Sequence, residues 1–214
     1  MDLIILFAER NMSSVSIVYK NIYFYRLIMN LIYGGKYNQR YSLLKKIIER
    51  ERPASVIEFC FGDVQIAQYC ASQNIKWTGY DLNESFVKNA LSHKLDARLE
   101  DIMKISDFPK ADLFIISGSL YHFNSADTNT LFTRVFENTK KFLISEPVRN
   151  LSDSKGLIGK IARRSANAGK GEEHFRYNEQ TFKAALDKLA TKFAFNTEKV
   201  GPTTRDIVVF LTKP

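Results

Sequence analysis

Small and acidic residues recur where short apolar runs of this sequence end, and their spacing suits a nucleotide-like ligand. Glu58-Phe59-Cys60-Phe61-Gly62-Asp63 follows the first run. A small-residue turn there brings backbone N–H groups and a helix N-terminus close to a ligand. Asp81 ends the second run, nineteen residues after Gly62. A carboxylate at about that spacing accepts hydrogen bonds from ribose hydroxyls. The next three runs end close to Asp101, Ser117 and Glu146.

The elements that must position these residues alternate between strand and helix. Apolar runs at 55–60, 77–81, 97–100, 112–117 and 141–145 are separated or followed by stretches of helical period at 64–73, 85–93, 126–138 and 178–192. Such alternation predicts βαβ units in a parallel sheet, with ligands at the carboxyl ends of the strands. Runs at 193–200 and 206–212, joined at Gly201-Pro202, predict a closing antiparallel hairpin. The predicted fold is therefore an α/β, Rossmann-like, doubly wound sheet of seven strands, mostly parallel.

The first 52 residues show helical periodicity rather than the alternation of strands and helices that follows. Helical period runs from 18 to 33, where Gly34-Gly35 ends it, and again from about 38 to 50. We therefore expect residues 1–52 to form an N-terminal helical segment that covers the site, and residues 53–214 to form the ligand-binding Rossmann-like domain.

Composition sets the broad class. Of 214 residues, 45% are apolar and 25% are charged, which excludes collagen-like, disordered and disulfide-scaffold proteins. Cys60 and Cys70 are the two cysteines, too few for a disulfide framework or a four-cysteine zinc site, and they fit a cytoplasmic protein. Scattered histidines predict no metal. The apolar opening is too short to span a membrane, so no span is expected.

Positive charge is concentrated in two stretches. Lys and Arg exceed Asp and Glu by 31 − 23 = 8 overall, by 8 − 2 = 6 over residues 140–170, and by 9 − 4 = 5 over residues 1–52. We expect an anionic partner to meet these stretches.

With this order of motifs, the chain resembles the class I S-adenosylmethionine-dependent methyltransferases over roughly residues 40–214. That family carries a D/E-x-G/C-x-G-x-G motif after the first strand, acidic residues after the second and third, and a terminal antiparallel hairpin. Two residues depart from its pattern. Cys60 replaces the usual first glycine, and Val64 stands where the third is expected.

The resemblance implies S-adenosylmethionine as cofactor and assigns residues to each part of it. The methionine end would lie against Glu58, Cys60 and Gly62, with Tyr33 closing over its carboxylate. Asp81 would hold the ribose and Ser117 would lie near the sulfonium. The adenine would contact Leu82, Asn83, Asp101 and Ile102.

The resemblance also indicates the acceptor. Residues 117–120 lack the Pro-Pro-aromatic loop of nucleic-acid amino methyltransferases, which favours a small-molecule acceptor and disfavours nucleic acid. An anionic small molecule would suit the basic stretches. The methyl group would move by in-line displacement, with His122 or Glu146 as base for a hydroxyl acceptor. Tyr121, Arg149 and His174 would contact the acceptor. The oligomeric state is left open.

Two other functions fit parts of the pattern. A nicotinamide-type oxidoreductase would share the sheet, but the missing glycines and the terminal hairpin argue against it. A non-catalytic module on the same fold would bind RNA or an anionic membrane surface through the basic stretches. Steep salt dependence of nucleic-acid binding would distinguish that module from the enzyme.

Overall fold

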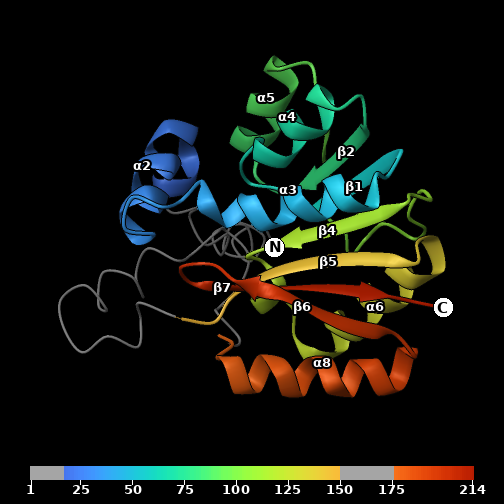
Figure 1. Ribbon diagram of the computed structural model, residues 1–214. Coiled ribbons are helices and arrows are strands. Elements are labelled where there is room, and N and C mark those ends of the chain that lie inside the picture. The colour runs from blue at the N-terminus through green and yellow to red at the C-terminus, as the bar shows by residue number, and fades with distance from the viewer. Residues whose placement is uncertain (1–16, 150–175) are drawn as a thin grey trace, which may run out of the picture.

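A computed structural model describes residues 17–149 and 176–214, in which seven strands form one sheet (Figure 1). The strand order is β3-β2-β1-β4-β5-β7-β6. β7 runs antiparallel to both β5 and β6, and the other pairings are parallel. The bounds are β1 Ser55–Phe59, β2 Lys76–Asp81, β3 Asp96–Leu99, β4 Leu113–Ser117, β5 Lys141–Pro147, β6 Asn196–Pro202 and β7 Asp206–Thr212. The predicted fold is confirmed, including the terminal hairpin that argued against an oxidoreductase.

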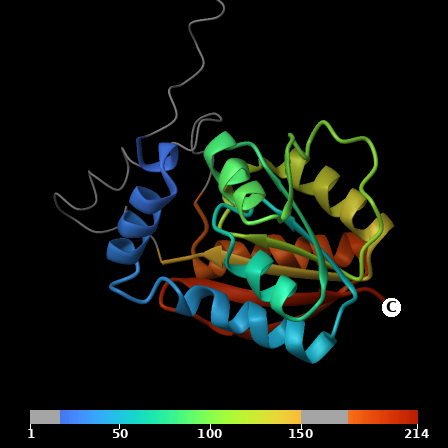
Figure 2. The ribbon, with the colours of Figure 1, turned by 90° about the horizontal axis from the view of Figure 1, so that it is seen from above.

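Helices cover both faces of the sheet, which explains why its central strands are apolar throughout. On one face lie α3 Gln39–Glu51, α4 Gln65–Ser72 and α5 Glu84–Ser92, and on the other lie α6 Ser125–Asn138 and α8 Glu179–Phe193. Figure 2 shows α3 and α6 on opposite sides of the strands. Successive residues of β4 alternate between the two hydrophobic cores: Ile115 packs with α3 and α4, whereas Phe114 and Ile116 pack with α6 and α8.

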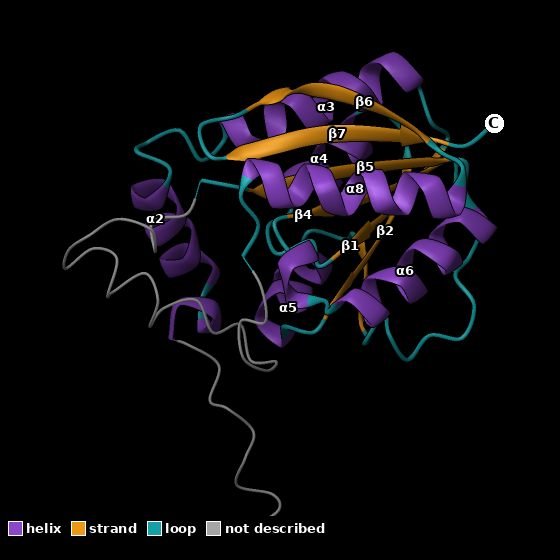
Figure 3. Cartoon of the chain, turned by 90° about the horizontal axis from the view of Figure 1, so that it is seen from below, coloured by secondary structure: helices purple, strands orange, loops and turns teal. Residues whose placement is uncertain are grey.

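The N-terminal helical stretch divides in two. A 3-10 turn, η2 Ile17–Lys20, precedes α2 Ile22–Ile32, so the single helix predicted over 18–33 is wrong. Asn21 separates them because its extended backbone lets its side chain accept hydrogen bonds from the N–H groups of Tyr23 and Phe24. Figures 1 and 3 show α2 at the end of the sheet toward which β4 and β5 run.

The start of β6 also differs from the expectation of a strand from 193. Phe193 is the last residue of α8, and Ala194 ends that helix in a left-handed conformation at φ +53°. Phe193 and Phe195 pack on Phe132 and Phe136 of α6. Burial of these rings, rather than strand propensity, therefore sets the boundary.

None of the helices within residues 17–149 and 176–214 is long and apolar enough to cross a bilayer.

Candidate functional site

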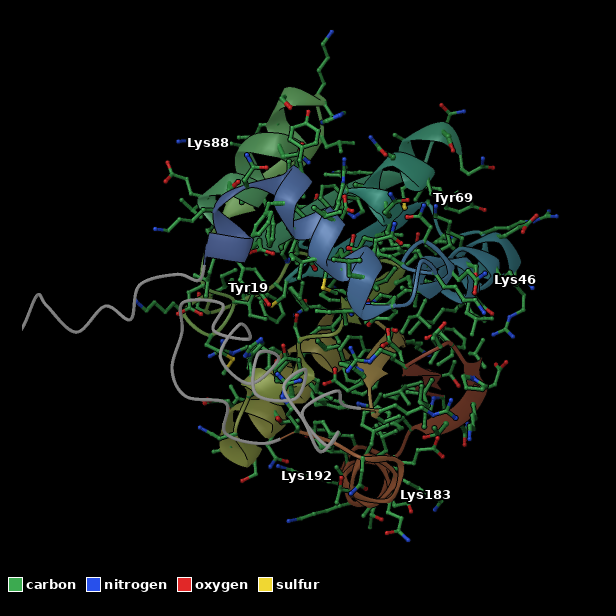
Figure 4. The ribbon with its side chains drawn as sticks, turned by 90° about the vertical axis from the view of Figure 1, so that its left-hand side faces the viewer. Tyr19, Lys46, Tyr69, Lys88, Lys183 and Lys192 are labelled. Carbon is green, nitrogen blue, oxygen red and sulfur yellow. The ribbon has the colours of Figure 1, made fainter. Side chains whose placement is uncertain are left out.

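A cavity of about 290 Å³ opens at the carboxyl ends of β1, β2 and β4. Ile28, Met29 and Ile32 of α2 form part of its wall. Figure 4 faces this end of the molecule, with Tyr19 beside α2, Lys88 of α5 above, and Lys183 and Lys192 of α8 below. Most of the residues predicted to form the site line the cavity: Tyr33, Cys60, Gly62, Asp81, Leu82, Asn83, Asp101, Ile102, Ser117, Tyr121 and His122.

Asp81 joins two loops at the cavity wall. Its Oδ2 accepts a hydrogen bond from the N–H of Gly62 at 3.0 Å, and its Oδ1 accepts one from the N–H of Asn83 at 2.8 Å. Gly62 adopts φ +58°, a conformation that glycine reaches without strain. Burial raises the pKa of Asp81 to about 6, although the backbone hydrogen bonds oppose the rise. A carboxylate has about four acceptor positions, so Asp81 retains capacity for a ligand's hydroxyl groups.

Glu58 lies behind this wall rather than on it. Its side chain is fully buried and accepts a hydrogen bond from Trp77 Nε1 at 2.9 Å. Burial raises its pKa to about 8. The structure thus does not bring Glu58 into the cavity with Cys60 and Gly62. Cys60 itself lines the cavity, with a left-handed backbone at φ +51° and its N–H donated to the Tyr80 carbonyl oxygen at 2.7 Å.

The turn after β3 is held in place by a side chain of α6. The N–H of Met103 donates to Asp101 Oδ1 at 3.1 Å. Arg134 Nη1 donates to the carbonyl oxygens of Ile102, Met103 and Ile105, at 3.3, 3.1 and 2.7 Å. This side chain fixes the wall on which the adenine is expected, and no pattern in the sequence indicated its role.

Asn83 uses both polar atoms of its side chain for hydrogen bonds within the protein. Its Oδ1 accepts from the N–H groups of Ser85 and Phe86 and so caps α5, while its Nδ2 donates to the Tyr19 carbonyl oxygen at 2.9 Å. Leu82, next to it, is 48% exposed and lines the cavity. Leu82 is therefore the better placed of the two to meet an adenine ring through its side chain.

The end of β4 depends on a residue that sequence reasoning missed, Arg40. The side chain is buried and Nε lies 2.9 Å from Asp206 Oδ2. Gly118 has φ +66°, and a Cβ there would overlap the Arg40 guanidinium. A cation on the same face of α3 as the apolar residues Tyr41 and Leu44 was the available signal for its burial.

Ser117 lines the cavity, and its buried Oγ has no hydrogen-bond partner within the described residues. Buried hydroxyls are normally hydrogen-bonded, so this atom suits a ligand or an ordered water.

Glu146 supports the cavity wall from inside the protein. Its Oε2 accepts from the N–H of Leu120 at 3.1 Å and its Oε1 from the N–H of Tyr121 at 3.2 Å, which fixes the 3-10 turn η3 Leu120–His122. Burial raises its pKa to about 8. Glu146 is fully buried and does not line the cavity, so the structure brings His122 to the site but not Glu146.

Of the residues predicted to bind the acceptor, Arg149 lies outside the cavity lining, and His174 lies outside the described residues. Arg149 is exposed and lies 3.4 Å from Glu179 Oε1. The lining instead includes Arg176 and Arg205. Arg205 precedes β7, and because β7 is antiparallel, its amino end meets the edge at which the parallel strands finish.

Tyr33 presents its ring to the cavity but not a free hydroxyl. The OH donates to Asp206 Oδ1 at 2.7 Å. Asp206 therefore binds both Tyr33 and Arg40, and it joins the N-terminal helices to β7.

Comparison with known proteins identifies the fold. No family model and no curated protein matches the sequence. Among solved structures, the methyltransferase domain of bacterial CtHen1 matches with a TM-score of 0.62 at 13% identity, over 82% of this chain and 97% of that one. Human N-acetylserotonin methyltransferase, in complex with S-adenosylmethionine (SAM), matches with a TM-score of 0.59 at 17% identity, over 92% of this chain and 57% of that one.

Magnesium protoporphyrin IX methyltransferase from Synechocystis, with bound SAM, matches with a TM-score of 0.57 at 10% identity, over 83% and 80% of the two chains. This chain has the class I methyltransferase fold. An rRNA methylase from Escherichia coli matches as well, with a TM-score of 0.56 at 15% identity. The class I methyltransferase fold thus occurs with different acceptors, so the acceptor must be argued from the site.

Proposed function

We propose that this protein is a SAM-dependent methyltransferase that acts on a small-molecule acceptor. The observation that carries the proposal is Asp81: a buried carboxylate at the end of β2, hydrogen-bonded to the glycine of the loop after β1 and facing a cavity. Asp81 is the acidic residue that the resemblance assigns to the ribose, and its place in the cavity lining at the end of β2 supports the proposal.

The residues of the cavity fit this cofactor. Asp81 retains acceptor capacity for a ribose diol, and Leu82 and Ile102 supply apolar contacts for an adenine ring. Ser117 offers a buried hydroxyl without a partner among the described residues, midway along the edge of the sheet. Cys60 and Gly62 form the small-residue turn expected at the methionine end.

The cofactor, when bound, would supply an electrophilic methyl group on a sulfonium, and the protein has to position the acceptor and, where that acceptor is a hydroxyl, to take its proton. Holding the reacting atoms ~3 Å apart and aligned provides much of the rate. His122, on the turn fixed by Glu146, is the cavity residue suited to take a proton from an acceptor hydroxyl. Tyr121, whose ring centroid lies 4.0 Å from that of His122, forms the wall beside it.

Calorimetric titration with SAM and with its demethylated product, S-adenosylhomocysteine, tests the proposal. We expect micromolar binding to the wild type and at least a tenfold loss in Asp81→Asn. Asp96→Asn, which changes a half-exposed carboxylate on β3 outside the cavity lining, is the matched control and should bind as the wild type does. Absence of binding to a folded wild type would refute the proposal.

RNA is a second candidate acceptor, and the net charge of +8 favours it. Binding of a single-stranded RNA that weakens steeply with salt would support this acceptor. Salt-insensitive or absent binding would favour the small molecule.

The proposed location is the cytoplasm. The sequence holds two cysteines, Cys60 and Cys70, too few for a disulfide framework, as is usual in a reducing compartment.

A further inference from the structure

The guanidinium of Arg40 has more hydrogen-bond donors than the described residues use. The side chain is 4% exposed and lines the cavity. A guanidinium carries five N–H donors. Nε lies 2.9 Å from Asp206 Oδ2, whereas neither Nη atom makes a hydrogen bond to any residue that the structure describes. Donors buried without acceptors raise the free energy of a protein, so these Nη groups suit a ligand or an ordered water.

The groups around Arg40 fix its position without using those donors. Asp206 Oδ1 accepts a hydrogen bond from the Tyr33 hydroxyl at 2.7 Å, and Asp206 Oδ2 accepts one from the Ser145 hydroxyl at 3.1 Å. The centroids of the Tyr33 and Tyr41 rings lie 5.7 and 5.8 Å from the guanidinium carbon. A cation at such a distance is attracted to the face of an aromatic ring. Arg40 is therefore held in place with its Nη groups left for a ligand.

Arg40 lies at the end of β4, beside the loop after β1. A Cβ on Gly118 would overlap Nη2 of Arg40, so Nη2 lies against the backbone at that point. β4 pairs with β1 in the sheet, which places Gly118 next to the loop 60–62. Ser117, whose buried Oγ also lacks a partner among the described residues, precedes Gly118. Two polar groups without such partners thus lie at the same part of the cavity wall.

Tyr25 links Arg40 to that loop. Its hydroxyl oxygen lies 3.5 Å from the position that a Cβ on Gly62 would take. Burial raises the pKa of Tyr25, and the positive charge of Arg40 opposes the rise, which indicates that the two side chains lie close together. Arg40 and Gly62 are therefore on the same side of the cavity, at the end expected to hold the amino-acid part of the cofactor.

That part of the cofactor carries its one carboxylate. A guanidinium binds a carboxylate through paired N–H donors, and Arg40 offers such donors from its Nη atoms. The resemblance places Tyr33 over the carboxylate, but the Tyr33 hydroxyl is donated to Asp206. We propose that Arg40 binds the carboxylate of the cofactor's amino-acid part and makes that carboxylate a requirement for tight binding. The inference rests on the proposed function and names a binding residue for its cofactor.

Three ligands that differ at the amino-acid end test the inference by calorimetry. S-adenosylhomocysteine carries the carboxylate, S-adenosyl-3-thiopropylamine lacks that group alone, and 5′-methylthioadenosine lacks the whole amino-acid part. For each protein the affinity for S-adenosylhomocysteine is divided by the affinity for each of the other two ligands. Because this ratio compares ligands on one protein, a loss of stability that weakens all three alike leaves it unchanged.

Three variants alter the buried pair of Arg40 and Asp206. The double variant Arg40→Met/Asp206→Asn removes both charges, so that no carboxylate is left buried without a cation. Arg40→Lys keeps the charge but not the paired donors. Asp206→Asn is the matched control, because it breaks the same pair and leaves the Nη donors of Arg40 in place.

We expect the wild type and Asp206→Asn to bind S-adenosylhomocysteine at least ~tenfold more tightly than either ligand without the carboxylate. The ratio should fall to about one in the double variant and should be intermediate in Arg40→Lys. A wild type without the preference, or a double variant that keeps the wild-type ratio, would overturn the inference. If the double variant binds none of the ligands, Arg40→Lys decides: a reduced ratio supports the inference and an unchanged ratio overturns it.

The outcomes also separate this inference from the proposed function. Absence of S-adenosylhomocysteine binding to a folded wild type would refute both together. Binding that Asp81→Asn weakens, with a ratio that the Arg40 variants leave unchanged, would keep the proposed function and overturn the inference alone. The Nη groups of Arg40 would then be assigned to the acceptor.

Discussion

Substitution of Gly118 by alanine tests the close approach of α3 to the cavity edge. Gly118 adopts φ +66°, and an added Cβ would overlap the guanidinium of Arg40. Gly34, with φ +57°, has no atom within 4 Å of such a Cβ, so Gly34→Ala is a matched control for the backbone strain alone. The difference between the two variants isolates the displacement of Arg40.

The magnitude follows from what each variant loses. Alanine in the left-handed region costs ~1–2 kcal/mol, partly offset by ~0.4–1 kcal/mol from the less flexible unfolded chain. Gly118→Ala also separates Arg40 from the buried Asp206, and breaking a buried pair costs ~3–5 kcal/mol. We therefore expect Gly118→Ala to be about 3 kcal/mol less stable than Gly34→Ala, equivalent to about 6–12 °C in Tm for a chain of this size.

Urea denaturation followed by circular dichroism measures the difference. Arg40→Met and the double variant Gly118→Ala/Arg40→Met complete a cycle, in which the double variant should lose less than the sum of the two because the overlap has been removed. Equal destabilisation of Gly118→Ala and Gly34→Ala, or strict additivity in the cycle, would refute the packing argument.

Three further predictions concern the supports of the site. Burial raises the pKa of Glu58 from 4.5 to about 8, so the folded protein keeps a proton that the unfolded chain releases, and its stability falls as pH rises from about 4.5 to about 8. Glu58→Gln should remove that part of the fall, so that between pH 5 and pH 8 its free energy of unfolding gains up to ~4 kcal/mol over that of the wild type, at ~1.4 kcal/mol per pKa unit. Free energies from urea denaturation that change with pH in parallel for the two proteins would contradict this. Arg26→Met should cost ~1–3 kcal/mol and speed hydrogen exchange in α2, because Arg26 Nη2 lies 2.6 Å from the buried Asp63; unchanged exchange would show that this pair does not hold the helix. Arg134→Met should speed exchange at residues 102–105 and weaken S-adenosylhomocysteine binding about tenfold by calorimetry, whereas unchanged affinity would make that turn irrelevant to the cofactor.

The sequence predicted the parts of this protein that depend on local pattern. Apolar runs buried on both sides identified β1, β4 and β5, and the closing pair of runs predicted the hairpin. The turn predicted at Gly201-Pro202 is wrong, because both residues pair within β6 and residues 203–205 form the turn. The spacing of Gly62 and Asp81 predicted their proximity, because the carboxyl ends of neighbouring parallel strands meet at one edge.

Contacts between distant segments could not be predicted in this way. Glu58 and Glu146 sit at strand ends, as cavity residues do, but tertiary packing buries them to support Trp77 and η3. Arg205 precedes an antiparallel strand, whereas ligand-binding residues are expected after the carboxyl ends of parallel strands. Arg40 reaches Gly118 from a helix 78 residues earlier in the chain, and a single sequence holds no signal for that contact.

The central claim is that a SAM-type cofactor binds along the carboxyl edge of β1, β2, β3 and β4. Hydrogen–deuterium exchange with and without saturating S-adenosylhomocysteine tests it most directly. The account predicts slower exchange in the loops at 60–64, 81–84, 100–103 and 117–121, and no change in β6 at the opposite edge of the sheet. Unchanged exchange in those four loops, or protection confined to other parts of the chain, would contradict it.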